Sequence, residues 1–88
     1  MIVSYKNKET EKIFNSEVSL SYPGDIQRTA LRKLLLIDAA TAINDLRVPP
    51  GNRLEKLSGD REGSYSIRIN DQWRICFIWK DSDAYDVE

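Results

Sequence analysis

The residues of this sequence best suited to carry out chemistry are Arg53, Glu55, Arg68 and Arg74. Arg53 and Glu55 are two residues apart, whereas Arg68 and Arg74 lie in two neighbouring runs of alternating polar and apolar residues. The planar guanidinium group of arginine binds phosphate oxygens through two parallel hydrogen bonds, and a carboxylate beside it can accept a proton. This combination suits cleavage of RNA by its own 2′-hydroxyl, which needs a base for the hydroxyl proton and cations for the charge developing on the phosphate.

In such a reaction Glu55 would be the base, and Arg68 and Arg74 would hold the phosphate. A single glutamate among arginines also forms an ordinary salt bridge, and the spacing does not separate the two interpretations. The aromatic residues Tyr65 and Trp73 belong to the apolar alternation, so we expect them to pack in the core rather than to stack on bases. Further cations that could bind the phosphates of an RNA strand are Arg53, Lys56 and Arg61.

The segment from position 64 to 80 must position Arg68 and Arg74. Its apolar residues alternate with polar ones, which predicts a β-hairpin with one apolar face. Paired residues of an antiparallel ladder point to the same face, so a two-residue loop at 70–71, which pairs Ile67 with Arg74, would split that face. We therefore predict a three-residue loop over 70–72, since asparagine and aspartate tolerate the left-handed backbone that such loops use. The resulting pairs are Ile69 with Trp73, Ile67 with Ile75 and Tyr65 with Phe77.

The same register sets Arg68 directly opposite Arg74 on the polar face of the hairpin. Like charges directly opposite each other destabilise a sheet, so we expect an anion nearby. One candidate is internal: a carboxylate of the acidic end, Asp83 or Asp86, brought over by a further strand. The other candidate is a phosphate group of a ligand, and the pattern leaves both open.

Two helices are expected before the hairpin, to cover its apolar face. Residues 8–14 predict a short helix. Apolar residues spaced three and four apart predict a longer helix over 26–46, with Asp25 as its N-cap and the Pro49-Pro50-Gly51 turn beyond its end. Its predicted apolar stripe consists of Leu31, Leu35, Ala39, Ala42, Ile43 and Leu46, widened by Leu34 and Ile37.

Short strands are predicted at residues 1–5 and 53–55 from their β-branched, aromatic and alternating residues. If Leu54 faces the core, Arg53 and Glu55 lie on the polar face of the sheet. The chain of 88 residues is long enough for one domain with a single core. The candidate site then consists of Arg53, Glu55, Arg68 and Arg74, with Lys56 and Arg61 at its rim.

The composition excludes several classes of site. One cysteine and no histidine exclude an internal disulfide, structural zinc and histidine-based triads, and leave carboxylates as the only ligands for a metal. The longest apolar run, residues 34–37, is too short for a membrane span or a secretory signal, which with the single cysteine predicts a cytoplasmic protein. The net charge is −1, but residues 47–80 carry seven Lys/Arg against four Asp/Glu, which permits a local basic site.

Two segments resemble the HigB branch of the RelE-like bacterial toxins. They read RLEKLSGD at 53–60 and SIRINDQWRICF at 66–77, and the second is more specific than a generic hairpin. LIDAA at 36–40 and DLRVPPGN at 45–52 extend the resemblance, which spans residues 26–88 and, more loosely, the N-terminal quarter. It implies a compact RelE-like α+β domain, with N-terminal helices packed on one face of a mostly antiparallel β-sheet.

The resemblance also implies a function. The chain would be the toxin of a type II toxin-antitoxin system that enters the A site of the small ribosomal subunit and cuts messenger RNA without a metal or cofactor. Its implied partner is a HigA-like helix-turn-helix antitoxin, through which it would reach operator DNA. Arg74 corresponds to a phosphate-stabilising arginine and Arg53 to a basic position. Glu55 matches by position only, because many HigB proteins have histidine there, although the GraT-like subgroup shares the glutamate.

The C-terminal end departs from the family pattern. Members of the family usually continue past the segment that matches residues 86–88 and end in an Asp-Tyr-His-like group that contributes to the active site. We therefore expect an incomplete tail, with Tyr85 as the next candidate for the general acid. Two hypotheses follow: a ribosome-dependent endoribonuclease, and a catalytically impaired binding module that acts in a repressor complex of antitoxin and operator. Only the first should arrest translation when the protein is expressed.

Overall fold

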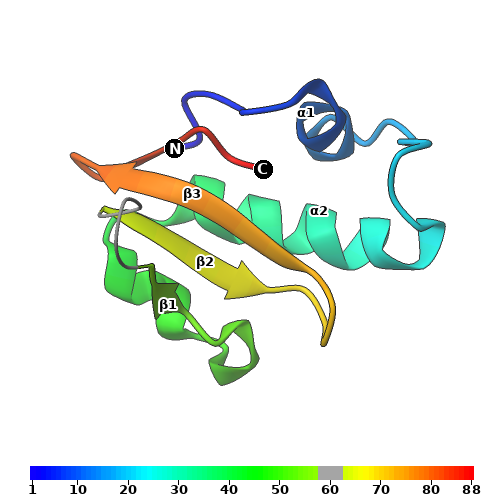
Figure 1. The fold of residues 1–88 in the computed structure, drawn as a ribbon. Coiled ribbons are helices and arrows are strands. Elements are labelled where there is room, and N and C mark those ends of the chain that lie inside the picture. Colours follow the sequence, from blue (N-terminus) through cyan, green and yellow to red (C-terminus); the bar gives the residue numbers. More distant parts are fainter. Residues whose placement is uncertain (58–62) are drawn as a thin grey trace.

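The computed structural model describes residues 1–57 and 63–88, which form an antiparallel sheet with helices on one face (Figure 1). The N-terminal segment, predicted as a strand, adds two parallel bridges, from Ile2 to Ala84 and from Tyr5 to Val87. The expected mostly antiparallel sheet is therefore confirmed. In the order of the sheet, the strands are β1 (Glu55–Lys56), β2 (Ser64–Arg68), β3 (Arg74–Lys80) and β4 (Asp83–Tyr85).

The helices lie before the sheet in the chain and pack on its apolar face, as predicted (Figure 1). The core includes Leu34, Ile37, Ile67 and Phe77, each of which is at most 2% exposed. In the described part of the chain, no helix has both the length and the apolar character that a membrane span requires. The helices are α1 (Lys8–Phe14), α2 (Gly24–Ala39) and the short 3-10 helices η1 (Ile43–Arg47) and η2 (Pro50–Asn52).

The predicted long helix was wrong at both ends. It stops before residue 40, because the Asp45 carboxylate accepts hydrogen bonds from the backbone N–H groups of Thr41 (3.0 Å) and Ala42 (3.1 Å) and so starts the separate 3-10 helix η1. The same bonds lower the pKa of Asp45. At the other end Pro23 occupies the N-cap position, and Asp25 lies in the first helical turn.

The face that α2 buries also differs from the prediction. Leu35 and Ala39, expected in the apolar stripe, are exposed, and Ala42 is exposed beyond the helix. Adjacent leucines at positions 34 and 35 make two neighbouring rows equally apolar, so packing against the sheet, rather than the period, selects the buried row. The buried residues of α2 are Ile26, Ala30, Leu34 and Ile37.

The hairpin of β2 and β3 has the predicted register, and its ladder ends at Arg68 and Arg74. The predicted pair of Ile69 with Trp73 lies beyond the strands and is joined by a backbone hydrogen bond from Ile69 to Trp73 (2.9 Å), so residues 70–72 form the turn, but for a different reason than predicted. None of residues 70–72 has a positive φ. Instead, the Asn70 side-chain oxygen accepts hydrogen bonds from the backbone N–H groups of Gln72 (2.8 Å) and Trp73 (2.9 Å), which closes the turn locally. The ladder pairs are Tyr65 with Phe77, Ile67 with Ile75 and Arg68 with Arg74.

Replacing Ile67 with valine should lower the free energy of unfolding by about 0.5–1.5 kcal/mol, because this side chain is fully buried under α2. Ile78 offers a matched control. The same change on the polar face of β3, where the side chain is 37% exposed, should cost less than about 0.5 kcal/mol. Urea-induced unfolding of both variants measures the difference, and equal losses would contradict the assignment of the two faces.

Candidate active site

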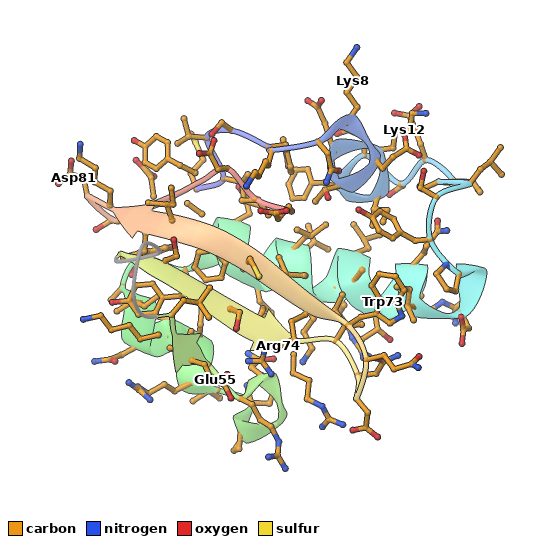
Figure 2. The ribbon with its side chains drawn as sticks, viewed as in Figure 1. Lys8, Lys12, Glu55, Trp73, Arg74 and Asp81 are labelled. Carbon is orange, nitrogen blue, oxygen red and sulfur yellow. The ribbon has the colours of Figure 1, made fainter. Side chains whose placement is uncertain are left out.

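A depression of about 360 Å³ lies on the polar face of the sheet and contains the four residues predicted to form the site. They meet there because Glu55 pairs with Ser66, and Arg68 with Arg74, and paired residues share a face. Figure 2 shows Glu55 and Arg74 next to each other on the side of the sheet away from α2. The depression is lined by Arg53, Glu55, Arg68 and Arg74 and by the hairpin loop residues Asn70, Asp71 and Gln72.

The guanidinium group of Arg74 is held by contacts on two neighbouring strands and the corner before β1. Its Nε donates to the hydroxyl oxygen of the buried Ser66 (2.9 Å), and its Nη2 donates to the carbonyl oxygens of Arg53 (2.7 Å) and Ser66 (3.4 Å). The Glu55 carboxylate lies 3.7 Å from Nη2. Within the described part of the chain, Nη1 makes no hydrogen bond. Arg74 therefore presents a fixed cation with donors still available for a phosphate.

Arg53 lies at a strained corner of the chain. Its φ of 44° is in the left-handed region, which costs a residue with a side chain about 1–2 kcal/mol. The buried Asn52 holds the corner: it donates to the carbonyl oxygens of Leu46 (3.1 Å) and Val48 (3.3 Å) and accepts from the Lys33 ammonium group, whose pKa is lowered by burial. This conformation turns the Arg53 carbonyl oxygen toward Arg74, so the strain serves the site.

Arg53→Gly should be more stable than Arg53→Ala by about 1 kcal/mol, because glycine adopts the left-handed backbone without strain. Both variants lack the guanidinium group, so their difference isolates the backbone. At the exposed Arg47, in the 3-10 helix η1, the order should reverse, with glycine about 0.5–1 kcal/mol less stable than alanine. Urea-induced unfolding of the four variants measures both differences. If the glycine and alanine variants had the same order of stability at positions 53 and 47, the strained backbone at Arg53 would be contradicted.

The prediction that a carboxylate of the acidic end, Asp83 or Asp86, lies beside the facing arginines is wrong. β4 pairs with the far end of β3, so Asp83 and Asp86 do not reach Arg68 and Arg74. The Asp83 carboxylate lies 3.4 Å from the N-terminal ammonium group, and that of Asp86 accepts a hydrogen bond from the Ser4 hydroxyl (3.5 Å). The charge of Arg68 is balanced instead by Asp71, three residues further along the hairpin loop.

Two further residues predicted for the site, Lys56 and Tyr85, are not brought into the depression. Lys56 follows Glu55 in β1 and therefore points to the other face of the sheet. Tyr85 pairs four residues along β3 from Arg74, a separation of roughly 13 Å along the strand. Arg61 lies outside the described residues.

Sequence reasoning missed Ser66 and Asp71 as residues of the site. Ser66 stands two residues before Arg68 and so shares its face, a signal that the period of two already contained. Asp71 stands three residues after Arg68 across a tight loop, which brings the two side chains together. In residues 1–57 and 63–88, no group of three or more cysteine, aspartate or glutamate side chains is arranged to hold a metal ion.

Comparison with known proteins identifies the family. Residues 3–88 match the family described as the RelE-like toxin of the type II toxin-antitoxin system HigB. Toxin HigB-1 of Vibrio cholerae is 41% identical over 85 residues, which are 96% of this chain and 90% of that protein. Endoribonuclease HigB of Proteus vulgaris is 40% identical over 86 residues, 97% of this chain and 91% of that protein. An uncharacterised Haemophilus influenzae protein is 39% identical over 62 residues, 70% of this chain and 61% of that protein.

The matched region includes every element of the sheet, both α-helices and the arginines of the depression. Two relatives that bear the name HigB align with nearly the whole chain at about two identical residues in five. The chain therefore belongs to the HigB-like family of RelE-like toxins of type II toxin-antitoxin systems.

Proposed function

We propose that this chain is a ribosome-dependent endoribonuclease that cuts messenger RNA in the A site of the small ribosomal subunit and thereby inhibits translation. The observation that carries the proposal is the guanidinium group of Arg74, which Ser66 and the carbonyl oxygen of Arg53 hold beside the Glu55 carboxylate. The name of the Proteus vulgaris relative supports the same reaction. The glutamate at position 55 supports a place in the GraT-like subgroup.

The proposed reaction is a transesterification within RNA. The 2′-oxygen attacks the neighbouring phosphorus, its proton passes to the Glu55 carboxylate, and the bond from phosphorus to the 5′-oxygen breaks, which leaves a 2′,3′-cyclic phosphate and a 5′-hydroxyl. Arg68 and Arg74 stabilise the charge that develops on the phosphate oxygens, so the reaction uses protein cations in place of a metal. The leaving oxygen takes a proton from a general acid. Arg53 and Arg61 bind neighbouring phosphates of the RNA strand, whereas Lys56, on the other face of the sheet, does not share this role.

The proposed partners follow from the family. Type II systems pair a toxin with an antitoxin, and we propose an antitoxin of the HigA-like helix-turn-helix kind, through which the toxin contacts operator DNA. The proposed site of action is the cytoplasm, where ribosomes are reached directly.

Glu55→Gln should lower the rate of RNA cleavage about 10²-fold, because an amide cannot accept the 2′-hydroxyl proton. The measurement is single-turnover cleavage of messenger RNA on programmed ribosomes, together with arrest of translation after induced expression. The exposed Glu17→Gln removes the same charge away from the depression and should leave the rate unchanged. A normal rate for Glu55→Gln would reduce Glu55 to a salt-bridge partner of Arg74.

A second candidate function is a catalytically impaired binding module that acts in a repressor complex of antitoxin and operator. The distance of Tyr85 from Arg74 favours it, because this tyrosine is too far along the sheet to protonate a leaving group held by Arg74. Continued translation after induced expression, with intact repression of the operator by toxin and antitoxin together, would establish this function instead.

A further inference from the structure

The two facing arginines of the depression are held in different ways. Arg74 donates to Ser66 and to the carbonyl oxygen of Arg53, and it also pairs with Glu55. Among the described residues Arg68 has one side-chain partner, the Asp71 carboxylate, which its Nη2 contacts. Arg74 is thus fixed to the sheet, whereas Arg68 is tethered to the hairpin loop.

The pair of Arg68 and Asp71 is easily exchanged for another anion. The Asp71 side chain is 91% exposed, and exposed ion pairs contribute little stability, because both groups are well solvated when apart. A phosphate offers arginine two parallel charge-assisted hydrogen bonds, whereas Asp71 contacts only Nη2. The exchange needs no movement of the loop backbone, which the Asn70 side chain fixes through the N–H groups of Gln72 and Trp73.

We propose that Asp71 holds Arg68 in the free protein and releases it to a phosphodiester group when RNA binds. The inference rests on the proposed function and adds a residue that sets the affinity for the substrate. Three arginines and two carboxylates line the depression, so its net charge of +1 matches the single negative charge of one phosphodiester. After the exchange the Asp71 carboxylate stays in water, where it already lies. Asp71 therefore competes with the substrate for Arg68.

The test is binding of an RNA oligonucleotide whose 2′-O-methyl groups block cleavage. Asp71→Asn should tighten binding about two- to fivefold, the equivalent of one exposed ion pair, and Arg68→Ala in the same chain should abolish the gain. In NMR spectra the guanidinium signal of Arg68 should shift when the oligonucleotide is added to the unmodified protein. It should already be displaced in Asp71→Asn before RNA is added.

Asp81→Asn is the matched control, because it removes the same charge from an exposed turn at the other end of β3 from Arg74 (Figure 2). Asp81→Asn should increase the affinity for RNA by a smaller factor than Asp71→Asn does, and that factor should be the same with and without Arg68. Any of four results would overturn the proposal. The first two are unchanged or weaker RNA binding by Asp71→Asn, and the same gain in affinity from Asp71→Asn when Arg68 is replaced by alanine. The other two are a gain in affinity from Asp81→Asn as large as that from Asp71→Asn, and an Arg68 signal that does not shift when the oligonucleotide is added. The proposed function fails separately, if Arg74→Ala cleaves messenger RNA on ribosomes at the normal rate.

Discussion

Arg74→Ala should lower the rate of RNA cleavage about 10²–10³-fold, the loss that follows removal of one preorganised donor to a developing negative charge. The reason is the arrangement of its guanidinium group. Ser66 and the carbonyl oxygen of Arg53 fix it before substrate arrives, so no reorganisation is needed as charge builds up on the phosphate. Single-turnover cleavage on programmed ribosomes measures the effect, and the exposed Arg47→Ala, outside the depression, should cleave normally.

The same substitution should cost only about 1 kcal/mol of folding free energy. The lost hydrogen bonds to Ser66 and Arg53 are partly offset by relief of the repulsion between Arg74 and Arg68. Arg74→Lys keeps the charge but loses the forked geometry, so its cleavage rate should lie between those of the unmodified protein and Arg74→Ala. If urea-induced unfolding showed that these variants lose several kcal/mol of folding free energy in proportion to their loss of cleavage rate, Arg74 would instead be a structural residue.

A chain lengthened past Glu88 by a Tyr-His pair should cleave RNA about 10²–10⁴-fold faster, the usual contribution of general acid catalysis. The 88 residues contain no histidine, the side chain whose unperturbed pKa lies nearest neutrality. The register indicates where the new group would lie. Glu88 and Cys76 exchange two backbone hydrogen bonds (3.0 and 3.1 Å), so a strand continued antiparallel to β3 places its second added residue opposite Arg74 and on the same face.

The register also supplies the control for this experiment. One glycine inserted before the Tyr-His pair moves the imidazole by one position and so to the face toward α2, where it should give no gain. Single-turnover rates of the three forms on programmed ribosomes compare them directly. Equal rates would mean that the general acid lies within residues 1–88, and equal gains from both extensions would contradict the register.

The hairpin could be predicted from the sequence because burial of one face makes its register unique. A slip of the register by one residue would expose the side chain of Ile67 or of Phe77 to solvent, so the alternation alone places Arg68 opposite Arg74. The same alternation places Glu55 beside them through β1. Most of the candidate site could therefore be predicted from the sequence, because the regular geometry of a β-sheet fixes which residues share a face.

Features that depend on a choice between similar alternatives could not be predicted. Leu34 and Leu35 are equally apolar, and only packing against the sheet buries the first and exposes the second. The end of α2 depends on the Asp45 side chain, whose capping bonds compete with continued helix formation. The anion beside Arg68 was missed, because the sequence pattern suggested only the acidic end or a ligand phosphate, and it is the loop geometry that brings Asp71 to Arg68.

The bridges between the first and last residues of the chain have a consequence for biosynthesis. The backbone N–H of Val3 donates to the carbonyl oxygen of Ala84 (2.8 Å), and that of Lys6 donates to Val87 (2.9 Å). These contacts join residues 3 and 6 to residues 84 and 87, so they close a much longer loop than the hairpin or the helices do and should form after them. While the ribosome still holds residues 84–87 this edge cannot form, so the N-terminal segment is fixed to the sheet only after those residues have emerged.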